Sequence, residues 1–268
     1  MPRVRTPRPA EQDSDEETFD SVDVPAAVIC AWCGRGDCAG CAKERASASG
    51  VIAIVPWERP LSAWSGRFFA TVQATTKGAE GFFRSLPDGP ISPALTFAVI
   101  AEVFAVASTA ALVAPLVVLG IPGLLLRFLS DDGTRIAVLL ATLVGIVGFT
   151  LLLVGAHALH GWVLAPEVSR TRGLRLGFYA CGWDFGSSPA GVVAATYAEG
   201  VVAGFSLLGS SVTAPSRSID AALAGLFRLD PEKARRAKQR AMRLAMLTSV
   251  PGVVVVMVAV VATALFAR

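Results

Sequence analysis

The sequence is poor in charged residues. Asp, Glu, Lys and Arg make up 17% of its 268 residues, whereas a soluble domain usually carries about 25%. The shortage is local, because three stretches contain no charged residue at all: Val103–Leu126, Ile136–Pro166 and Leu244–Ala267. Each is long enough for the roughly 20 apolar residues that a bilayer crossing requires. The composition therefore excludes an ordinary soluble domain and predicts an all-α, polytopic membrane protein.

Histidine is scarce as well, and this argues against several kinds of enzyme. The two histidines, His157 and His160, both flank one apolar stretch, so a Ser-His-Asp arrangement has little to build on. The sequence contains no phosphate-binding loop, nucleophile elbow or H-E-x-x-H motif. We also expect no signal peptide, because the first apolar stretch, Val24–Ile29, is short and follows acidic residues. We expect a non-enzymatic protein.

Cysteine is rare but strongly clustered. Four of the five cysteines follow the spacing C-x2-C-x4-C-x2-C: Cys30, Cys33, Cys38 and Cys41. Paired thiolates at both ends of a short loop can close four sulfur ligands around one structural zinc ion, and the intervening glycines permit the turns. An iron–sulfur cluster uses the same ligands, and a metal-free segment is the third alternative. The remaining cysteine, Cys181, is predicted to be a packing residue.

The cysteine segment is predicted to be a zinc-binding recognition head for a protein partner. Binding of nucleic acid is not expected, because Glu11–Asp23 carries seven acidic residues and no basic one and would repel phosphate. A thiol-redox or zinc sensor is a further alternative. The predicted parts of the chain are a disordered acidic tail (1–24), the zinc knuckle (25–47), a linker with an amphipathic helix (48–90), a transmembrane region (91–210) and a final basic helix and span (211–268).

The number of spans depends on the first apolar block. As one helix, Ala94–Leu129 would measure about 54 Å, too long for a hydrocarbon core of about 30 Å. Pro115 and the Gly120–Gly123 segment offer a break. Dividing the block there gives about five spans, within a range of three to five. A weaker block, Ser187–Leu208, is rich in small residues and is expected inside the bundle.

Two segments are predicted to contact the membrane surface. Residues 59–86 place aromatic residues at helical spacing among basic ones, which suits the headgroup layer; a helix packed on the protein itself is the alternative. Asp230-Pro231-Glu232 predicts a helix start, and the basic helix that follows is expected to bind anionic headgroups unless it is merely solvated. Its basic residues are Lys233, Arg235, Arg236, Lys238, Arg240 and Arg243. Bases here and near the N-terminus predict that both face the cytoplasm.

Ionisable residues within the apolar region are the remaining candidates for a site. They are Glu102, His157, His160 and Glu199, and such residues are costly in hydrocarbon and often line pathways. Together they could form a proton-linked or metal site. The alternative is that the histidines lie at the membrane interface and that each glutamate bonds a neighbouring helix or the backbone. A small channel or proton-linked transporter using Glu102 and Glu199 is thus the second functional hypothesis.

Several passages resemble bacterial Yip1-domain membrane proteins. They are Pro56-Trp57-Glu58, Phe68 to Thr71, Gly81 to Pro87, Ser92 to Ala98, His157 to Gly161, Thr171 to Ala180 and Ser188 to Gly191. The resemblance covers residues 56–210, whereas the basic helix within 211–250 departs from it. It implies five spans, a cytosolic N-terminus and a role in membrane organisation or trafficking, with no catalytic residues. The expected protein is a multi-pass adaptor of the bacterial inner membrane, able to form oligomers.

Overall fold

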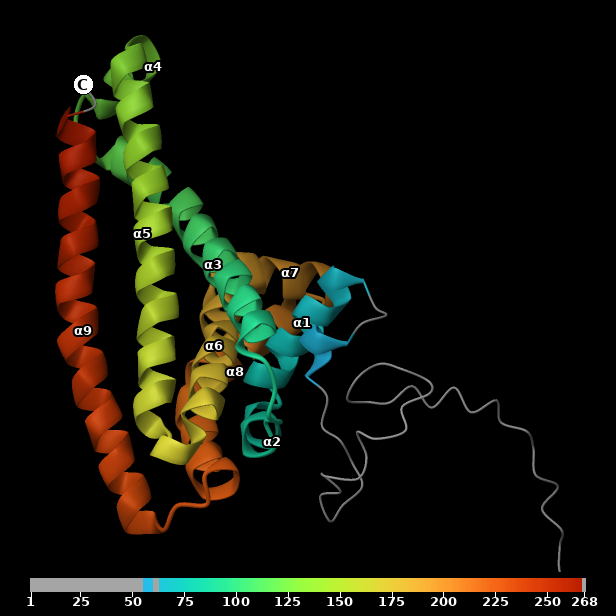
Figure 1. Ribbon diagram of the computed structural model, residues 1–268. Helices are drawn as coiled ribbons and strands as arrows, with labels where there is room; N and C mark the ends of the chain where they lie inside the picture. The colour runs from blue at the N-terminus through green and yellow to red at the C-terminus, as the bar shows by residue number, and fades with distance from the viewer. Residues whose placement is uncertain (1–54, 60–62, 267–268) are drawn as a thin grey trace, which may run out of the picture. The chain divides into compact units, whose positions relative to one another are not determined.

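The computed structural model describes residues 55–59 and 63–266 (Figure 1). Contacts divide the chain into two units, Met1–Val51 and Ile52–Arg268, and the description concerns the second. All its described elements are helical, which confirms the all-α prediction. They are η1 (Pro56–Glu58), α1 (Trp64–Thr76), α2 (Ala79–Arg84), α3 (Ile91–Gly120), α4 (Leu124–Ser130), α5 (Asp132–Leu164), η2 (Glu167–Ser169), α6 (Arg170–Ser187), α7 (Pro189–Glu199), α8 (Val201–Ala221), η3 (Ala222–Leu226) and α9 (Pro231–Phe266).

Among the described residues, three helices are long and apolar enough to cross a membrane: α3, α5 and α9. This supports a membrane protein and gives the lower end of the predicted three to five spans. The expected division of Ala94–Leu129 into two spans is not seen. Helix α3 continues through Pro115 to Gly120, and the seven residues of α4 are too few to cross. The chain turns at Gly123, whose φ of 77° suits glycine.

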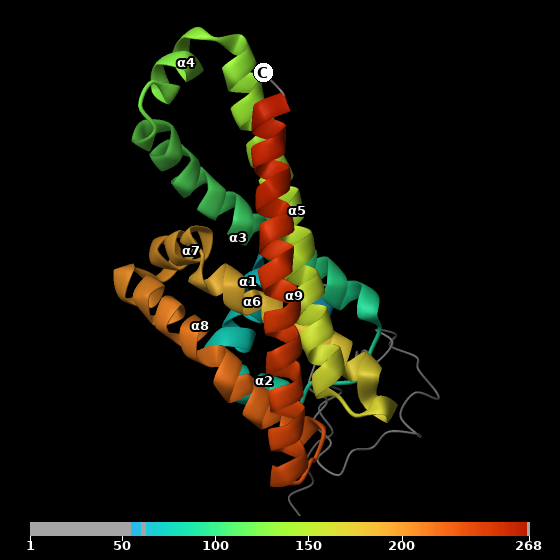
Figure 2. The same cartoon turned by 90° about the vertical axis from the view of Figure 1, so that its left-hand side faces the viewer.

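Helices α5 and α9 pack side by side and antiparallel (Figures 1 and 2). A Cβ atom added to Gly148 would lie 3.0 Å from the side chain of Val256, and one added to Gly252 would lie 2.3 Å from Leu152. A step forward along α5 is therefore a step back along α9. This register sets the C-terminal end of α5 beside the basic start of α9.

The basic helix begins where the sequence predicts. Helix α9 starts at Pro231, and the Asp230 carboxylate accepts a hydrogen bond from the backbone N–H of Lys233 at 2.9 Å. This bond holds the pKa of Asp230 below its ordinary value. The start of α5 has the same design, since Asp131 accepts from the N–H of Thr134 at 2.7 Å. Both caps satisfy donors that a helix end leaves free.

Helix α6 is the most enclosed helix of the unit, although its sequence is not the most apolar. Most of its residues are buried, and it contacts α1, α3, α5, α7 and α8. Charged and polar side chains, among them Arg175 and Asp184, lie within it. The sequence did not predict a central helix here, because these side chains depress its hydropathy.

Helices α1 and α2, which fall within the predicted amphipathic segment of residues 59–86, pack on the protein, as in the alternative to the interfacial prediction. Helix α1 buries Phe68 and Val72, and α2 buries Phe83. The ring centroid of Phe68 lies 4.9 Å from the ring centroid of Phe185 on α6. It lies 5.4 Å from that of Phe97 on α3. Aromatic pairs at such separations add to the gain from burial. The buried face of this segment therefore belongs to the core, whereas Trp64 remains exposed.

The weaker apolar block, Ser187–Leu208, forms no continuous span. It is divided between α7 and α8 at Gly200, whose φ is 92°. The expectation that it lies inside the bundle is wrong, because Tyr197, Val202 and Phe205 are strongly exposed. Its small residues serve the contact between the two helices instead: a Cβ atom on Gly204 would lie 2.2 Å from the Thr196 hydroxyl.

Candidate functional site

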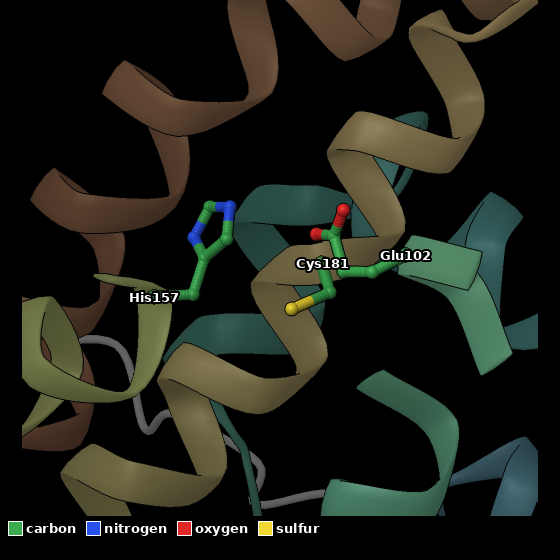
Figure 3. A group of neighbouring side chains, drawn as sticks. All are labelled: Glu102, His157 and Cys181. Atoms are coloured by element: carbon green, nitrogen blue, oxygen red, sulfur yellow. The ribbon is translucent and has the colours of Figure 1, made fainter. Parts of the chain in front are cut away.

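Three helices bring a carboxylate, an imidazole and a thiol together in the core (Figure 3). Glu102 comes from α3, His157 from α5 and Cys181 from α6. One potential ligand atom from each lies within 4.8 Å of the other two. The sequence predicted a site that contains Glu102 and His157, whereas Cys181 was predicted to be a packing residue. The three side chains are called the α3–α5–α6 cluster below.

The cluster forms where α5 and α6 touch through their backbones. A Cβ atom on Gly177 would lie 2.1 Å from the carbonyl oxygen of His157, and one on Gly161 would lie 2.1 Å from that of Gly173. Glycines four residues apart on α6 thus let the helices approach closely, as small residues do in membrane bundles. This contact holds His157 against α6, one turn away from Cys181.

Asp184 adjoins the cluster and was not predicted. Its carboxylate lies 2.8 Å from Nε2 of His157, and the two side chains are 35% and 20% exposed. The indole ring of Trp183 lies edge-on to the imidazole at 5.9 Å between ring centroids. An acidic residue three positions after Cys181 on one helix was the available signal, and the aspartate provides the more exposed side of the group.

Glu102 is the least satisfied member of the cluster. It is fully buried, and neither carboxylate oxygen has a hydrogen-bond partner among the described residues. Burial raises the pKa of the Cys181 thiol well above its ordinary value, and the nearby carboxylates of Glu102 and Asp184 raise it further. The thiol therefore keeps its proton at neutral pH unless a cation displaces it.

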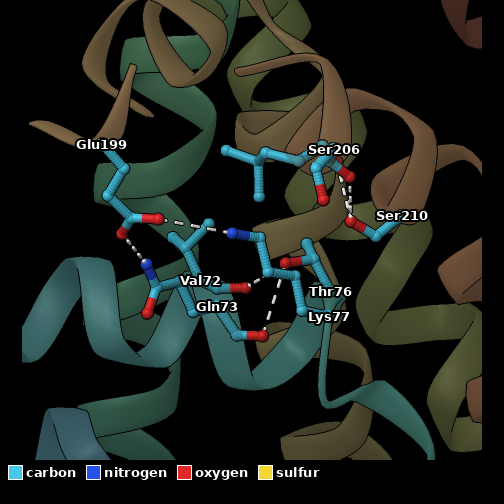
Figure 4. Close-up of polar contacts among 8 residues, drawn as sticks. Val72, Gln73, Thr76, Lys77, Glu199, Ser206 and Ser210 are labelled. Atoms are coloured by element: carbon cyan, nitrogen blue, oxygen red, sulfur yellow. Dashed lines mark hydrogen bonds and ion pairs between the residues drawn. The ribbon is translucent and has the colours of Figure 1, made fainter. Parts of the chain in front are cut away.

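The other two predicted intramembrane residues lie outside the cluster. His160 is on the next turn of α5, and its buried Nε2 has no partner among the described residues. Glu199 ends α7 and is about half exposed. Its carboxylate accepts a hydrogen bond from Gln73 at 2.7 Å and pairs with Lys77 at 3.6 Å, both on or next to α1 (Figure 4). Glu199 therefore bonds a neighbouring helix, which is the alternative to a role in an intramembrane site.

A second buried polar group surrounds Arg175, which is fully buried. Its guanidinium pairs with Glu58 of η1 at 2.8 Å and donates to the carbonyl of Pro90. The Tyr179 hydroxyl donates to the same carboxylate, and burial raises the pKa of this phenol, as does the contact with Glu58. This group joins η1, the start of α3 and α6, so its role is structural.

The six basic residues at the start of α9 are all exposed. Lys233 pairs with Asp230, Arg236 with Glu232 and Lys238 with Asp220. Arg235, Arg240 and Arg243 have no ion pair within the part of the chain that the structure describes. These three are therefore the bases most available to an external anion.

Comparison of the chain with protein-family models, curated proteins and solved structures gave no match. The resemblance to Yip1-domain proteins stays a prediction from the sequence. The predicted zinc ligands, Cys30, Cys33, Cys38 and Cys41, lie outside the described residues. The zinc knuckle therefore also stays a prediction.

Proposed function

We propose that this chain is a non-catalytic integral membrane adaptor of Yip1-like type in a bacterial inner membrane. In this proposal α3, α5 and α9 form the anchor. The N-terminal cysteines bind a structural zinc ion and form a cytoplasmic head that recognises a protein partner. The basic start of α9 lies on the same side and contacts anionic headgroups.

The observation that carries the proposal is the division of α9 into two exposed surfaces. Its first turns expose six basic side chains, whereas Met246, Val254, Val258 and Leu265 are exposed apolar residues farther along. Exposed apolar side chains in such a run suit lipid contact. Exposed bases next to a span suit the negatively charged cytoplasmic leaflet.

The end of α5 supports the same membrane boundary. The antiparallel register sets this end beside the basic start of α9. Here Trp162 is partly exposed, and the Arg170 guanidinium lies 4.4 Å from its ring centroid. Tryptophan is enriched at membrane interfaces, and a cation over its face is stabilising. The aromatic and basic residues thus mark one interface on two neighbouring helices.

The sidedness can be measured with reporters that are active in only one compartment. We expect reporters at the N-terminus and in the loop before Pro231 to report the cytoplasm. Reporters between Asp131 and Gly133 and at the C-terminus should report the opposite side, because three spans alternate. A cytoplasmic signal between Asp131 and Gly133 would favour five spans. An N-terminus on the outer side would contradict the adaptor proposal.

The lipid contact can be tested with two matched triple variants that remove the same charge. Replacing Arg235, Arg240 and Arg243 by glutamine should strongly reduce the anionic lipid retained by the purified protein. Each base near a charged surface contributes about 1 kcal/mol. Replacing Lys233, Arg236 and Lys238 should reduce it less, because neighbouring acids already neutralise them. Lipid mass spectrometry gives the measurement, and unchanged retention in both variants would contradict the contact.

A further inference from the structure

The adaptor role does not explain why the Glu102 carboxylate is buried. It is fully buried on α3, and both oxygens lack a hydrogen-bond partner among the described residues. A buried carboxylate is costly unless it is neutralised or paired. Its neighbours are the imidazole of His157, the thiol of Cys181 and a second carboxyl group, that of Asp184, and none of these is a lysine or an arginine. A bound cation would satisfy this group.

The chemistry of the neighbours identifies the class of cation. Carboxylate oxygen, imidazole nitrogen and thiolate sulfur together suit borderline transition metals, above all Zn²⁺. Ligand atoms of a tetrahedral zinc ion lie roughly 3.5 Å apart, since its bonds measure about 2.0–2.3 Å. The three ligand atoms already lie within 4.8 Å of one another. Small side-chain movements would therefore bring three of the four ligand positions of such an ion into place.

Asp184 has the position of a supporting residue. Its carboxylate lies 2.8 Å from Nε2 of His157, and carboxylates that contact a metal-binding histidine fix its ring and increase its basicity. The aspartate is also partly exposed, which leaves an approach for an ion from outside the buried core. It is a positioning residue, or the fourth ligand if the ring turns.

We propose that Glu102, His157 and Cys181 bind one divalent transition-metal ion of the zinc class, with Asp184 positioning His157. This ion is separate from the one assigned to the N-terminal cysteines, and the inference does not rest on the adaptor role. Bound there, it would tie α3, α5 and α6 together. It displaces the thiol proton of Cys181 to solvent, so one proton leaves that residue as the metal–sulfur bond forms.

The test measures metal per chain in the full-length protein, purified without chelator and equilibrated with Zn²⁺. The parent variant carries serine at Cys30, Cys33, Cys38 and Cys41, which removes the predicted zinc knuckle. We expect it to retain about one tightly bound ion per chain. Adding Glu102→Gln or Cys181→Ser should abolish this binding. The matched control Glu199→Gln removes an exposed, bonded carboxylate and should leave it unchanged.

Two further measurements separate binding from general stability. Zn²⁺ should raise the unfolding temperature of the parent variant but not of Glu102→Gln. Asp184→Asn should weaken affinity about 10- to 100-fold. With Co²⁺, the thiolate-to-metal absorption band should vanish on Cys181→Ser substitution. A folded parent variant that holds no ion, or one whose binding survives both Glu102→Gln and Cys181→Ser, overturns the inference. A protein that holds metal with its four N-terminal cysteines but none without them also overturns the inference. That result would leave the adaptor proposal intact.

Discussion

Replacing Gly177 by alanine is expected to destabilise the protein by about 1–3 kcal/mol or more. The added Cβ atom would lie 2.1 Å from the carbonyl oxygen of His157 and 2.8 Å from its carbonyl carbon. Both are backbone atoms, so no side chain can rotate to make room. Helices α5 and α6 must move apart instead, which also weakens the contacts through Gly161 and Gly173. Denaturant or thermal unfolding in detergent measures the loss.

A matched control lies on α5 itself. At Gly155, an added Cβ atom would have no atom within 4 Å other than the adjoining residues and backbone of its own helix. Alanine there removes the conformational entropy cost of glycine in a helix and should cost nothing. Because the Gly177 contact holds His157 against α6, Gly177→Ala should also weaken Zn²⁺ binding by the cluster. Equal effects of Gly155→Ala and Gly177→Ala would contradict a tight backbone contact.

The three long apolar helices were predictable because their signal is local. A stretch without charge that is long enough to cross a bilayer needs no information from the rest of the chain. The same holds for the start of α9, where Asp230 and Pro231 supply the cap and the first turn. The span count differs because the break at Gly120–Gly123 is present, but the seven-residue α4 that follows it is too short to cross, and Pro115 lies inside α3.

The central position of α6 was not predictable from hydropathy. Taken alone, each charged residue in Arg170–Ser187 predicts a side chain that is exposed to solvent. The structure buries Arg175 because Glu58, 117 positions earlier, lies against it, and it shelters Asp184 because His157 faces it. These partners are distant in sequence, so a single sequence gives no signal for the pairing. Gly173-x-x-x-Gly177 was the one local indication that α6 touches another helix.

The α3–α5–α6 cluster was half predictable for the same reason. Glu102 and His157 stood out because an ionisable residue in an apolar stretch is unusual. Cys181 and Asp184 did not, because neither residue type is conspicuous in a polar helix. Glu199 was grouped with the cluster on sequence grounds, yet its position at the end of α7 gives it polar partners on α1 and partial exposure. Spacing along a chain does not report which helix faces lie together.

Glu58→Gln is expected to destabilise the protein by about 3–5 kcal/mol, because it leaves a buried guanidinium without its counter-charge. The Arg175 guanidinium lies fully buried on α6, 2.8 Å from the Glu58 carboxylate. Combining Glu58→Gln with Arg175→Met should cost less than the sum of the single changes, because the double variant buries no unpaired charge. Unfolding of the four proteins of this cycle measures the coupling.

The chain also contains an exposed ion pair of equal length, within one helix. Arg84 and Glu80 also lie 2.8 Å apart, but their side chains are 58% and 59% exposed. Water and salt screen this pair, so Glu80→Gln should change stability by about 1 kcal/mol or less. Burial, not distance, then accounts for the difference between the two substitutions. If both glutamine variants unfold alike, water must reach Arg175, and the group joining η1, α3 and α6 is not a closed core.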